Sequence, residues 1–259
     1  MSFRLQHLPS LAYDEVIKCM DTFDILSLID ASRKTKKHVV TITKRLKTNL
    51  VLFMNEEKVC CTPCQKFDEE LRPSEVLKKR SNEYSIEKFI SVIESFNNVF
   101  CIKTISIHIE TESSADPYLL WKYVKNQNLK IQKLYWEIED LSIEKTKEVI
   151  EGSSDVDTLE MHFLKEPPVF SAVDLYPLIT CKSVILFDIN LTSENLNLFL
   201  KYWAVNTTTL FAIRIVVVED LDRLVVLDGL KKEKDERANP ESRRFETRLS
   251  RRRFTLKEL

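Results

Sequence analysis

The chain has 259 residues, of which 44% are hydrophobic and 31% charged, and its formal net charge at pH 7 is -1. This length and composition are typical of a globular protein of one or two domains, and a charge so near zero gives no overall field that would attract nucleic acid or an acidic lipid surface. No apolar run reaches the ~18 to 20 residues of a membrane span, and the first ten residues lack the apolar core of a signal peptide. We therefore expect a soluble protein of the cytoplasm, the nucleus or both, with no membrane or nucleic-acid partner.

Glycine is rare, since only Gly152 and Gly229 occur in the whole chain. Phosphate-binding loops and nucleophile elbows use glycine where the backbone turns sharply or approaches a ligand, and neither G-x-G-x-x-G nor G-K-[ST] is present. No nucleophile–base arrangement stands out either. We therefore predict a protein that is not an enzyme, with no cofactor and no catalytic residues.

Two short helices are predicted in the stretch HLPSLAYDEVIKCMDTFDILSLIDASRKT (7–35). The first follows Pro9, because proline is tolerated in a first helical turn, and Asp21 and Thr22 can cap the second. In the second helix the apolar side chains spread over about 160° of arc, which is more than one partner helix covers. Another element or another protein is therefore expected against the apolar residues Val16, Ile17, Met20, Ile25, Leu26, Leu28 and Ile29.

Residues 45–85 form a less regular segment. The run NLVLFMNEEKVCCTP has two short apolar halves around residues 55–57, which is typical of a β-hairpin, and a charged linker follows it. The C-x-x-C spacing of Cys61 and Cys64 also occurs in zinc and redox sites, but no second Cys/His pair stands at a matching spacing. We therefore interpret these cysteines as part of the hairpin and predict no metal site.

From about residue 86 the sequence is repetitive. Segments with the pattern apolar-x-x-apolar-x-apolar alternate with helical stretches, and their starts lie 29, 25, 25 and 29 residues apart. A strand and a helix every ~20 to 29 residues are typical of leucine-rich-repeat-like solenoids, in which parallel strands stack and helices cover one side. The five predicted strand segments are Ile102/Ile105/Ile107, Ile131/Leu134/Trp136, Val156/Leu159/Met161, Cys181/Val184/Leu186 and Leu210/Ile213/Ile215.

The other side of these strands is predicted to carry rows of side chains across the sheet. The rows are Thr104, Lys133, Thr158 and Ser183; then Ser106, Tyr135, Glu160, Ile185 and Arg214; then His108, Glu137, His162 and Phe187. Adjacent strands lie ~4.8 Å apart, so His108, Glu137 and His162 converge, but nothing in the sequence indicates the outer hydrogen bonds that orient metal ligands. Aromatic residues on an open face favour a protein contact instead. The predicted target-binding residues are Tyr135, Glu137, Glu160, His162, Ile185, Phe187 and Arg214.

Residues 236–259 form a basic tail. From residue 231 to the end there are 11 Lys/Arg and 6 Asp/Glu, a local charge of +5. The motif SRRRF also fits a nuclear-localisation or nucleic-acid patch, but the interleaved acidic residues favour a solvated tail. A tail that folds back over the open sheet face, with Phe245 or Phe254 covering it, is the alternative to a protein partner there.

The first 44 residues resemble an F-box. Landmarks of that family occur in order and at the family's spacing, namely Phe3, Leu5, Leu8-Pro9, Val16-Ile17, Met20, Asp24-Ile25-Leu26, Leu28 and Ser32-Arg33. The resemblance implies a three-helix module that binds the Skp-type adaptor of an SCF ubiquitin ligase and, through it, a cullin ligase. The adaptor-binding residues that it implies are Leu5, Leu8, Pro9, Val16, Ile17, Met20, Ile25, Leu26 and Leu28.

Residues 86–235 resemble the type-2 F-box-associated domain. The best match is LTSENLNLFLKYW (191–203), a capped helix that ends Lys-x-Trp and precedes a polar turn and a strand. The turn AVNTTT lacks the glycine that many relatives have there. Together the two resemblances imply a substrate receptor that recruits an unidentified protein target to the ligase. The alternative is a pseudo-F-box interaction scaffold that engages no ligase.

The expected fold class is a mixed α+β and α/β chain with four parts. They are an F-box-like helical module (1–44), a linker with a hairpin (45–85), an irregular leucine-rich-repeat-like α/β solenoid (86–235) and the basic tail (236–259).

Overall fold

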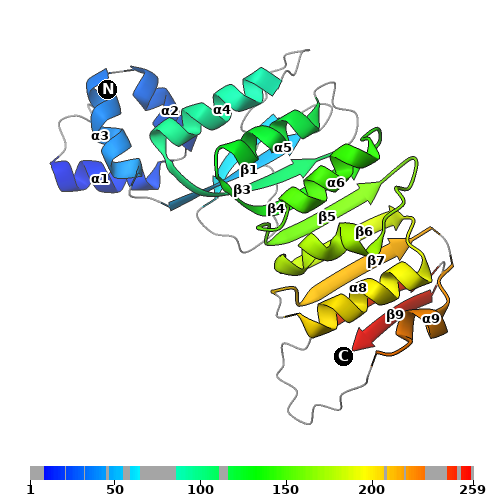
Figure 1. Ribbon diagram of the computed structural model, residues 1–259. Coiled ribbons are helices and arrows are strands. Elements are labelled where there is room, and N and C mark those ends of the chain that lie inside the picture. Colours follow the sequence, from blue (N-terminus) through cyan, green and yellow to red (C-terminus); the bar gives the residue numbers. More distant parts are fainter. Residues whose placement is uncertain are drawn as a thin grey trace, which may run out of the picture. The chain divides into compact units, whose positions relative to one another are not determined.

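The computed structural model is a mixed α/β protein, in which the described residues form six parallel strands and nine α-helices (Figure 1). Among those helices, none is both long enough and apolar enough to cross a membrane. The described residues are 9–20, 22–31, 33–44, 47–54, 59–64, 86–110, 116–206, 209–218, 220–230, 244–249 and 252–257.

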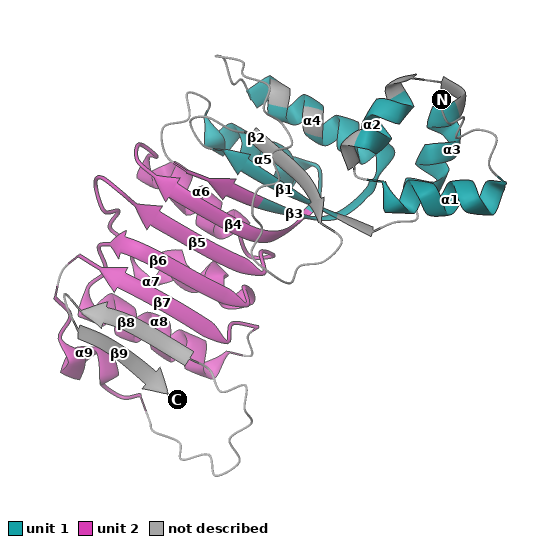
Figure 2. Cartoon of the chain, turned by 180° about the vertical axis from the view of Figure 1, so that it is seen from behind, with its two compact units in different colours: residues 1–106, 113–129 teal, residues 107–112, 130–259 magenta. Residues whose placement is uncertain are grey.

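The chain divides into two compact units (Figure 2). Unit 1 holds residues 1–106 and 113–129, and unit 2 holds residues 107–112 and 130–259. The division falls inside the segment 86–235, which the sequence analysis treats as one domain. The four-part organisation expected above stays a prediction.

Unit 1 begins with three α-helices, of which the residue pattern predicts the first two. They are α1 (Ser10–Cys19), α2 (Thr22–Ala31) and α3 (Arg33–Thr43), and α3 contacts both of the others. Each helix turns a stripe of apolar side chains inward, because residues three and four apart lie on one helix face. The buried apolar residues of the three helices are Tyr13, Ile17, Ile25, Ile29, Val39 and Ile42.

Unit 1 continues with a hairpin and two further helices. Strands β1 (Lys47–Met54) and β2 (Val59–Cys64) pair antiparallel, so the predicted hairpin is confirmed. Helix α4 (Ile86–Val99) contacts α3 and α5 (Pro117–Asn126), and the buried Thr43 hydroxyl donates to the Val99 carbonyl at 2.6 Å. The cysteines of the C-x-x-C motif lie on β2, and their side chains are outside the described part of the chain.

Unit 2 contains the repeated strands. They are the end of β3 (Cys101–Ile109), then β4 (Lys130–Ile138), β5 (Thr158–Phe163), β6 (Ser183–Ile189) and β7 (Ala212–Val217). Leu134, Leu159, Val184 and Ile213 stand opposite one another on four parallel strands, at offsets of 25, 25 and 29 residues. The register that the sequence period predicts is therefore confirmed, and so is the burial of these side chains, of which the first three are 0% exposed.

Among the described residues, helices cover one face of this sheet and none lies on the other, which we call the open face (Figures 1 and 2). Figures 1 and 2 view the unit from opposite sides, with helices in front of the strands in one and behind them in the other. Three of the helices start at a side chain that accepts from a backbone N–H of the first turn, provided by Ser142, Thr192 and Asp222. The elements are α6 (Ile143–Gly152), α7 (Ala172–Leu175), the 3-10 helix η2 (Tyr176–Thr180), α8 (Ser193–Val205) and α9 (Arg223–Leu227).

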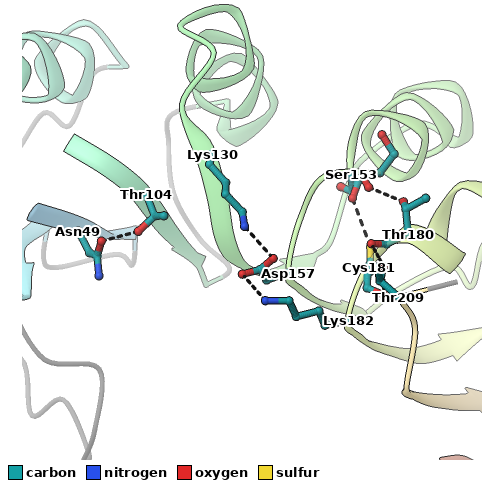
Figure 3. A network of polar contacts seen from close by, with 10 residues as sticks. Asn49, Thr104, Lys130, Ser153, Asp157, Thr180, Cys181, Lys182 and Thr209 are labelled. Atoms are coloured by element: carbon teal, nitrogen blue, oxygen red, sulfur yellow. Dashed lines mark hydrogen bonds and ion pairs between the residues drawn. The ribbon is translucent and has the colours of Figure 1, made fainter. Parts of the chain in front are cut away.

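Polar contacts link successive repeats at the starts of the strands (Figure 3). The Asp157 carboxylate lies 3.1 Å from the Lys130 ammonium and 3.2 Å from that of Lys182, which join β5 to both neighbours. The Thr180 hydroxyl donates to the Ser154 carbonyl, and one repeat later the Thr209 hydroxyl donates to the Thr180 carbonyl. The same contact thus recurs with the period of the strands.

Two strands lie in the region where the sequence analysis expects a solvated basic tail. β8 (Arg244–Leu249) pairs parallel with β7, and β9 (Arg252–Lys257) pairs antiparallel with β8. Strands paired in this way extend the sheet at its edge. The backbone around Phe245 and Phe254 is therefore part of the sheet and does not fold back over its open face.

Candidate protein-binding face

The strands of unit 2 separate two kinds of side chain. Along β5 half-buried and buried residues alternate at every step, and β7 repeats the pattern. Successive side chains of a strand point to opposite sides of a sheet, so one side is the core beneath the helices and the other is the open face. On β4 to β7 the predicted rows lie on this open face, because Tyr135, Glu160, Ile185 and Arg214 are in register, as are Glu137, His162 and Phe187. Ser106 on β3, predicted for the same rows, is buried.

Four rings contact one another in a row across the open face, with two stacked contacts and one tilted contact, and we call this row the ring ladder: His108, Tyr135, His162 and Phe187. The ring centroids of His108 and Tyr135 are 4.0 Å apart with planes only 7° from parallel. His162 lies 5.2 Å from Tyr135 and 4.3 Å from Phe187. Each ring comes from a different one of the adjacent strands β3, β4, β5 and β6. Cross-strand aromatic contacts of this kind stabilise a sheet and fix ring orientation.

Each of the first three rings has a carboxylate partner two residues away in the sequence. Two of these carboxylates lie on the same strand as their ring, and Glu110 directly follows β3. Nε2 of His108 lies 3.1 Å from Glu110, and Nε2 of His162 lies 3.0 Å from Glu160. The Tyr135 hydroxyl donates to Glu137 at 2.5 Å. Residues i and i+2 of a strand share a face, so the carboxylates surround the ladder.

One lysine of the face is already placed among these groups. The Lys133 ammonium lies 3.7 Å from the Glu160 carboxylate and 5.9 Å from the centroid of the Tyr135 ring. Its side chain is 43% exposed, whereas that of Glu160 is 19% exposed. A cation thus sits between a ring of the ladder and one of its carboxylates.

The electrostatics of the face keep two of its ionisable rings neutral at neutral pH. Burial, followed by the hydrogen bond to Glu137 and the charges of nearby glutamates, raises the pKa of Tyr135 well above its usual value. Burial lowers the pKa of His108, and this effect outweighs Glu110 and Glu137, which favour the charged ring. Tyr135 is therefore a hydrogen-bond donor near pH 7 and not a base.

The predicted target-binding residues are brought together, but their exposure differs from what the sequence suggests. Ile185 and Phe187 are both half-buried, and Phe187 packs on the His162 ring. Neither His108, which the sequence places on this face, nor Glu110 is among the predicted target-binding residues. The repeated ring–carboxylate spacing of two residues in HIE, YWE and EMH was the available signal.

The three residues considered for a metal, His108, Glu137 and His162, have other partners. His108 stacks on Tyr135, Glu137 accepts from Tyr135, and His162 lies against Glu160. Within the ranges that the structure describes, no group of three or more His, Cys, Asp or Glu side chains is arranged to hold a metal ion.

The residues expected to bind the adaptor divide by burial. Ile17 and Ile25 are buried among the three N-terminal helices, at 0% and 3% exposure, so they support the module from inside. Leu5 and Leu8 lie outside the described residues. The remaining members are accessible: Pro9 is exposed, and Val16, Met20, Leu26 and Leu28 are half-buried.

No protein-family model, curated protein or solved structure matches the chain. Function is therefore inferred from the residues and their geometry. The open face offers rigid rings, accepting carboxylates and a few apolar side chains, which are groups that bind a partner.

Proposed function

We propose that the chain is a non-catalytic substrate-recruiting subunit of an SCF-type ubiquitin ligase in the cytoplasm, the nucleus or both. Residues 1–44 act as an F-box that binds the Skp-type adaptor and, through it, the cullin ligase. Residues 86–235 form the F-box-associated domain, a leucine-rich-repeat-like solenoid, and bind the protein target. Neither part uses a cofactor or a metal.

The observation that carries the proposal is apolar surface left over on the three N-terminal helices. After Ile17 and Ile25 are buried, Val16, Leu26 and Leu28 still keep part of their surface in contact with water. Burying apolar surface is favourable by roughly 25 cal/mol per Å². A partner that covers these side chains therefore gains binding free energy, and the F-box resemblance of the same residues names the adaptor as that partner.

The proposed target-binding surface is the open sheet face of unit 2. Stacked strand–helix repeats present an extended, rigid surface on the side that their helices do not cover. The ring ladder orders that surface before any partner arrives, which lowers the entropy cost of binding. Half-buried Ile185 and Phe187 add apolar area beside it.

The adaptor-binding role is tested by mixing the purified full chain with recombinant Skp-type adaptor and measuring complex formation by sedimentation velocity. Leu26→Asp introduces a carboxylate into the proposed contact and should weaken binding at least about tenfold, since an unpaired buried charge is costly. Ser27→Asp is the matched control, because Ser27 is its exposed neighbour on α2 and should keep wild-type binding.

A second variant guards against loss of folding. Leu28→Glu alters another half-buried position of α2, and circular dichroism reports whether each variant keeps its helices. Wild-type binding by folded Leu26→Asp and Leu28→Glu chains would refute the contact. If the wild-type chain itself does not bind the adaptor but does bind a target, the chain is a pseudo-F-box scaffold.

A further inference from the structure

We propose that the ring ladder and its carboxylates bind an arginine-bearing segment of the target protein. The inference rests on the proposed function only for the premise that this face captures a target. It adds the chemical class of what is captured, and it can be tested without the adaptor.

Charge complementarity is the first reason. Three carboxylates, Glu110, Glu137 and Glu160, border the ladder within hydrogen-bond distance of its rings. A carboxylate has about four lone-pair sites, so acceptance from one ring leaves room for a further donor. The Glu110 side chain is 43% exposed and is the most accessible of those with a stated exposure. Lys133 and Arg214 also lie on this face, so these five side chains carry three negative and two positive charges, a balance of -1 that favours a cationic partner over an acidic one.

Lys133 supplies the second reason, because it shows how a cation is received. Its ammonium lies 3.7 Å from Glu160 and within 5.9 Å of the Tyr135 ring centroid. His108 and Glu110 repeat this combination of one ring and one carboxylate at the other end of the ladder, and the Glu110 side chain is 43% exposed. An arriving side chain therefore meets a second ring–carboxylate pair of the kind that Lys133 uses.

Arginine fits these pairs better than lysine. Its planar guanidinium can donate two parallel hydrogen bonds to a carboxylate, and its weak hydration makes contact with a ring less costly. The three-carbon stem of the side chain can lie against the ladder ring beside the carboxylate that it reaches. Because the ladder rings stack on one another, their orientation is fixed before binding.

The strand spacing suggests a probe. Strands two apart are separated by roughly 10 Å, which is about the length of three residues of a polyproline II chain, in which side chains three residues apart point to the same side. Arginines three residues apart therefore address alternate strands. We would use a fluorescein-labelled peptide with three arginines separated by serine pairs, and matched peptides with lysine or glutamate in place of arginine.

Fluorescence anisotropy with the purified full chain measures binding. We expect the arginine peptide to bind more tightly than the lysine peptide, and the glutamate peptide not to bind. The double variant Glu110→Gln with Glu137→Gln keeps side-chain size and hydrogen-bond capacity, and it should weaken the arginine peptide about tenfold or more, since charged hydrogen bonds are the stronger ones. Glu151→Gln is the matched control, because Glu151 is exposed on α6, and it should change binding less than about twofold.

Three results would overturn the inference. They are equal binding of the arginine and glutamate peptides, an equal loss in the Glu151→Gln control, or self-association of the chain that the double variant abolishes, which would assign the face to a second copy. An unchanged melting temperature in the double variant separates lost contacts from lost folding. Failure of adaptor binding leaves this result standing, and failure here leaves the adaptor contact standing.

Discussion

Leu159→Ala tests the repeat architecture at its centre. Leu159 is 0% exposed on β5 and stands between Leu134 of β4 and Val184 of β6. The substitution removes about three buried carbon groups at ~0.8 kcal/mol each, and the cavity left between two flanking strands adds to that loss. We expect the free energy of unfolding of unit 2 to fall by about 3 to 4 kcal/mol.

Native-state hydrogen exchange of the β4, β5 and β6 amides is the suitable assay, because it reports on unit 2 without requiring both units to unfold together. Leu164→Ala is the matched control. Leu164 follows β5 directly and is 47% exposed, so the same substitution should cost about 1 kcal/mol or less. Equal losses in the two variants would refute the stacked-strand core.

The remaining predictions concern titratable groups. Burial raises the pKa of Cys181 to about 12, so in the native chain iodoacetamide should alkylate exposed Cys19 far faster than Cys181, as measured by peptide mass spectrometry, and equal rates would contradict the buried position. Burial and Glu137 raise the pKa of Tyr135, so replacing Tyr135 with Phe should remove the last-titrating phenol from the ultraviolet pH titration; loss of an earlier step would contradict this. Burial lowers the pKa of His108 below its model-compound value of 6.5, so the unfolded chain takes up this proton first; the resulting stability is fully present above pH 6.5 and is lost as pH falls toward the folded-state pKa. His108→Gln should reduce the dependence of the free energy of unfolding on pH between pH 7 and about 5, as measured by urea denaturation. An unchanged pH dependence would contradict this.

The sheet of unit 2 could be predicted from the sequence in detail. Apolar triads such as Val156/Leu159/Met161 repeat at offsets of 25 or 29 residues, and the same offsets appear in the strand register. Parallel strands need a helical crossover of a dozen or more residues, so period and register carry the same information. The hairpin was equally readable, because two apolar runs flank a short polar turn.

The ring ladder could not be derived in the same way. Its contacts depend on side-chain rotamers that place His108 over Tyr135 and not beside Glu137, and a row of residues does not specify rotamers. β8 was missed for another reason. Its sequence RFETRL alternates charged and less polar residues as a strand does, but the high charge of the region dominated the interpretation. The F-box resemblance implied adaptor contacts for Ile17 and Ile25, but a match of apolar positions does not separate a module's own core from its docking surface.

The most direct test of the proposed recruiting function is a binding measurement with the full chain, the Skp-type adaptor and the arginine peptide. Purified full chain is titrated with recombinant Skp-type adaptor by calorimetry, once alone and once saturated with the arginine peptide. We predict the same adaptor affinity in both titrations and a complex that contains chain, adaptor and peptide together, with Leu26→Asp losing the adaptor and keeping the peptide. Absence of adaptor binding by the wild-type chain, or displacement of the peptide by the adaptor, would contradict it.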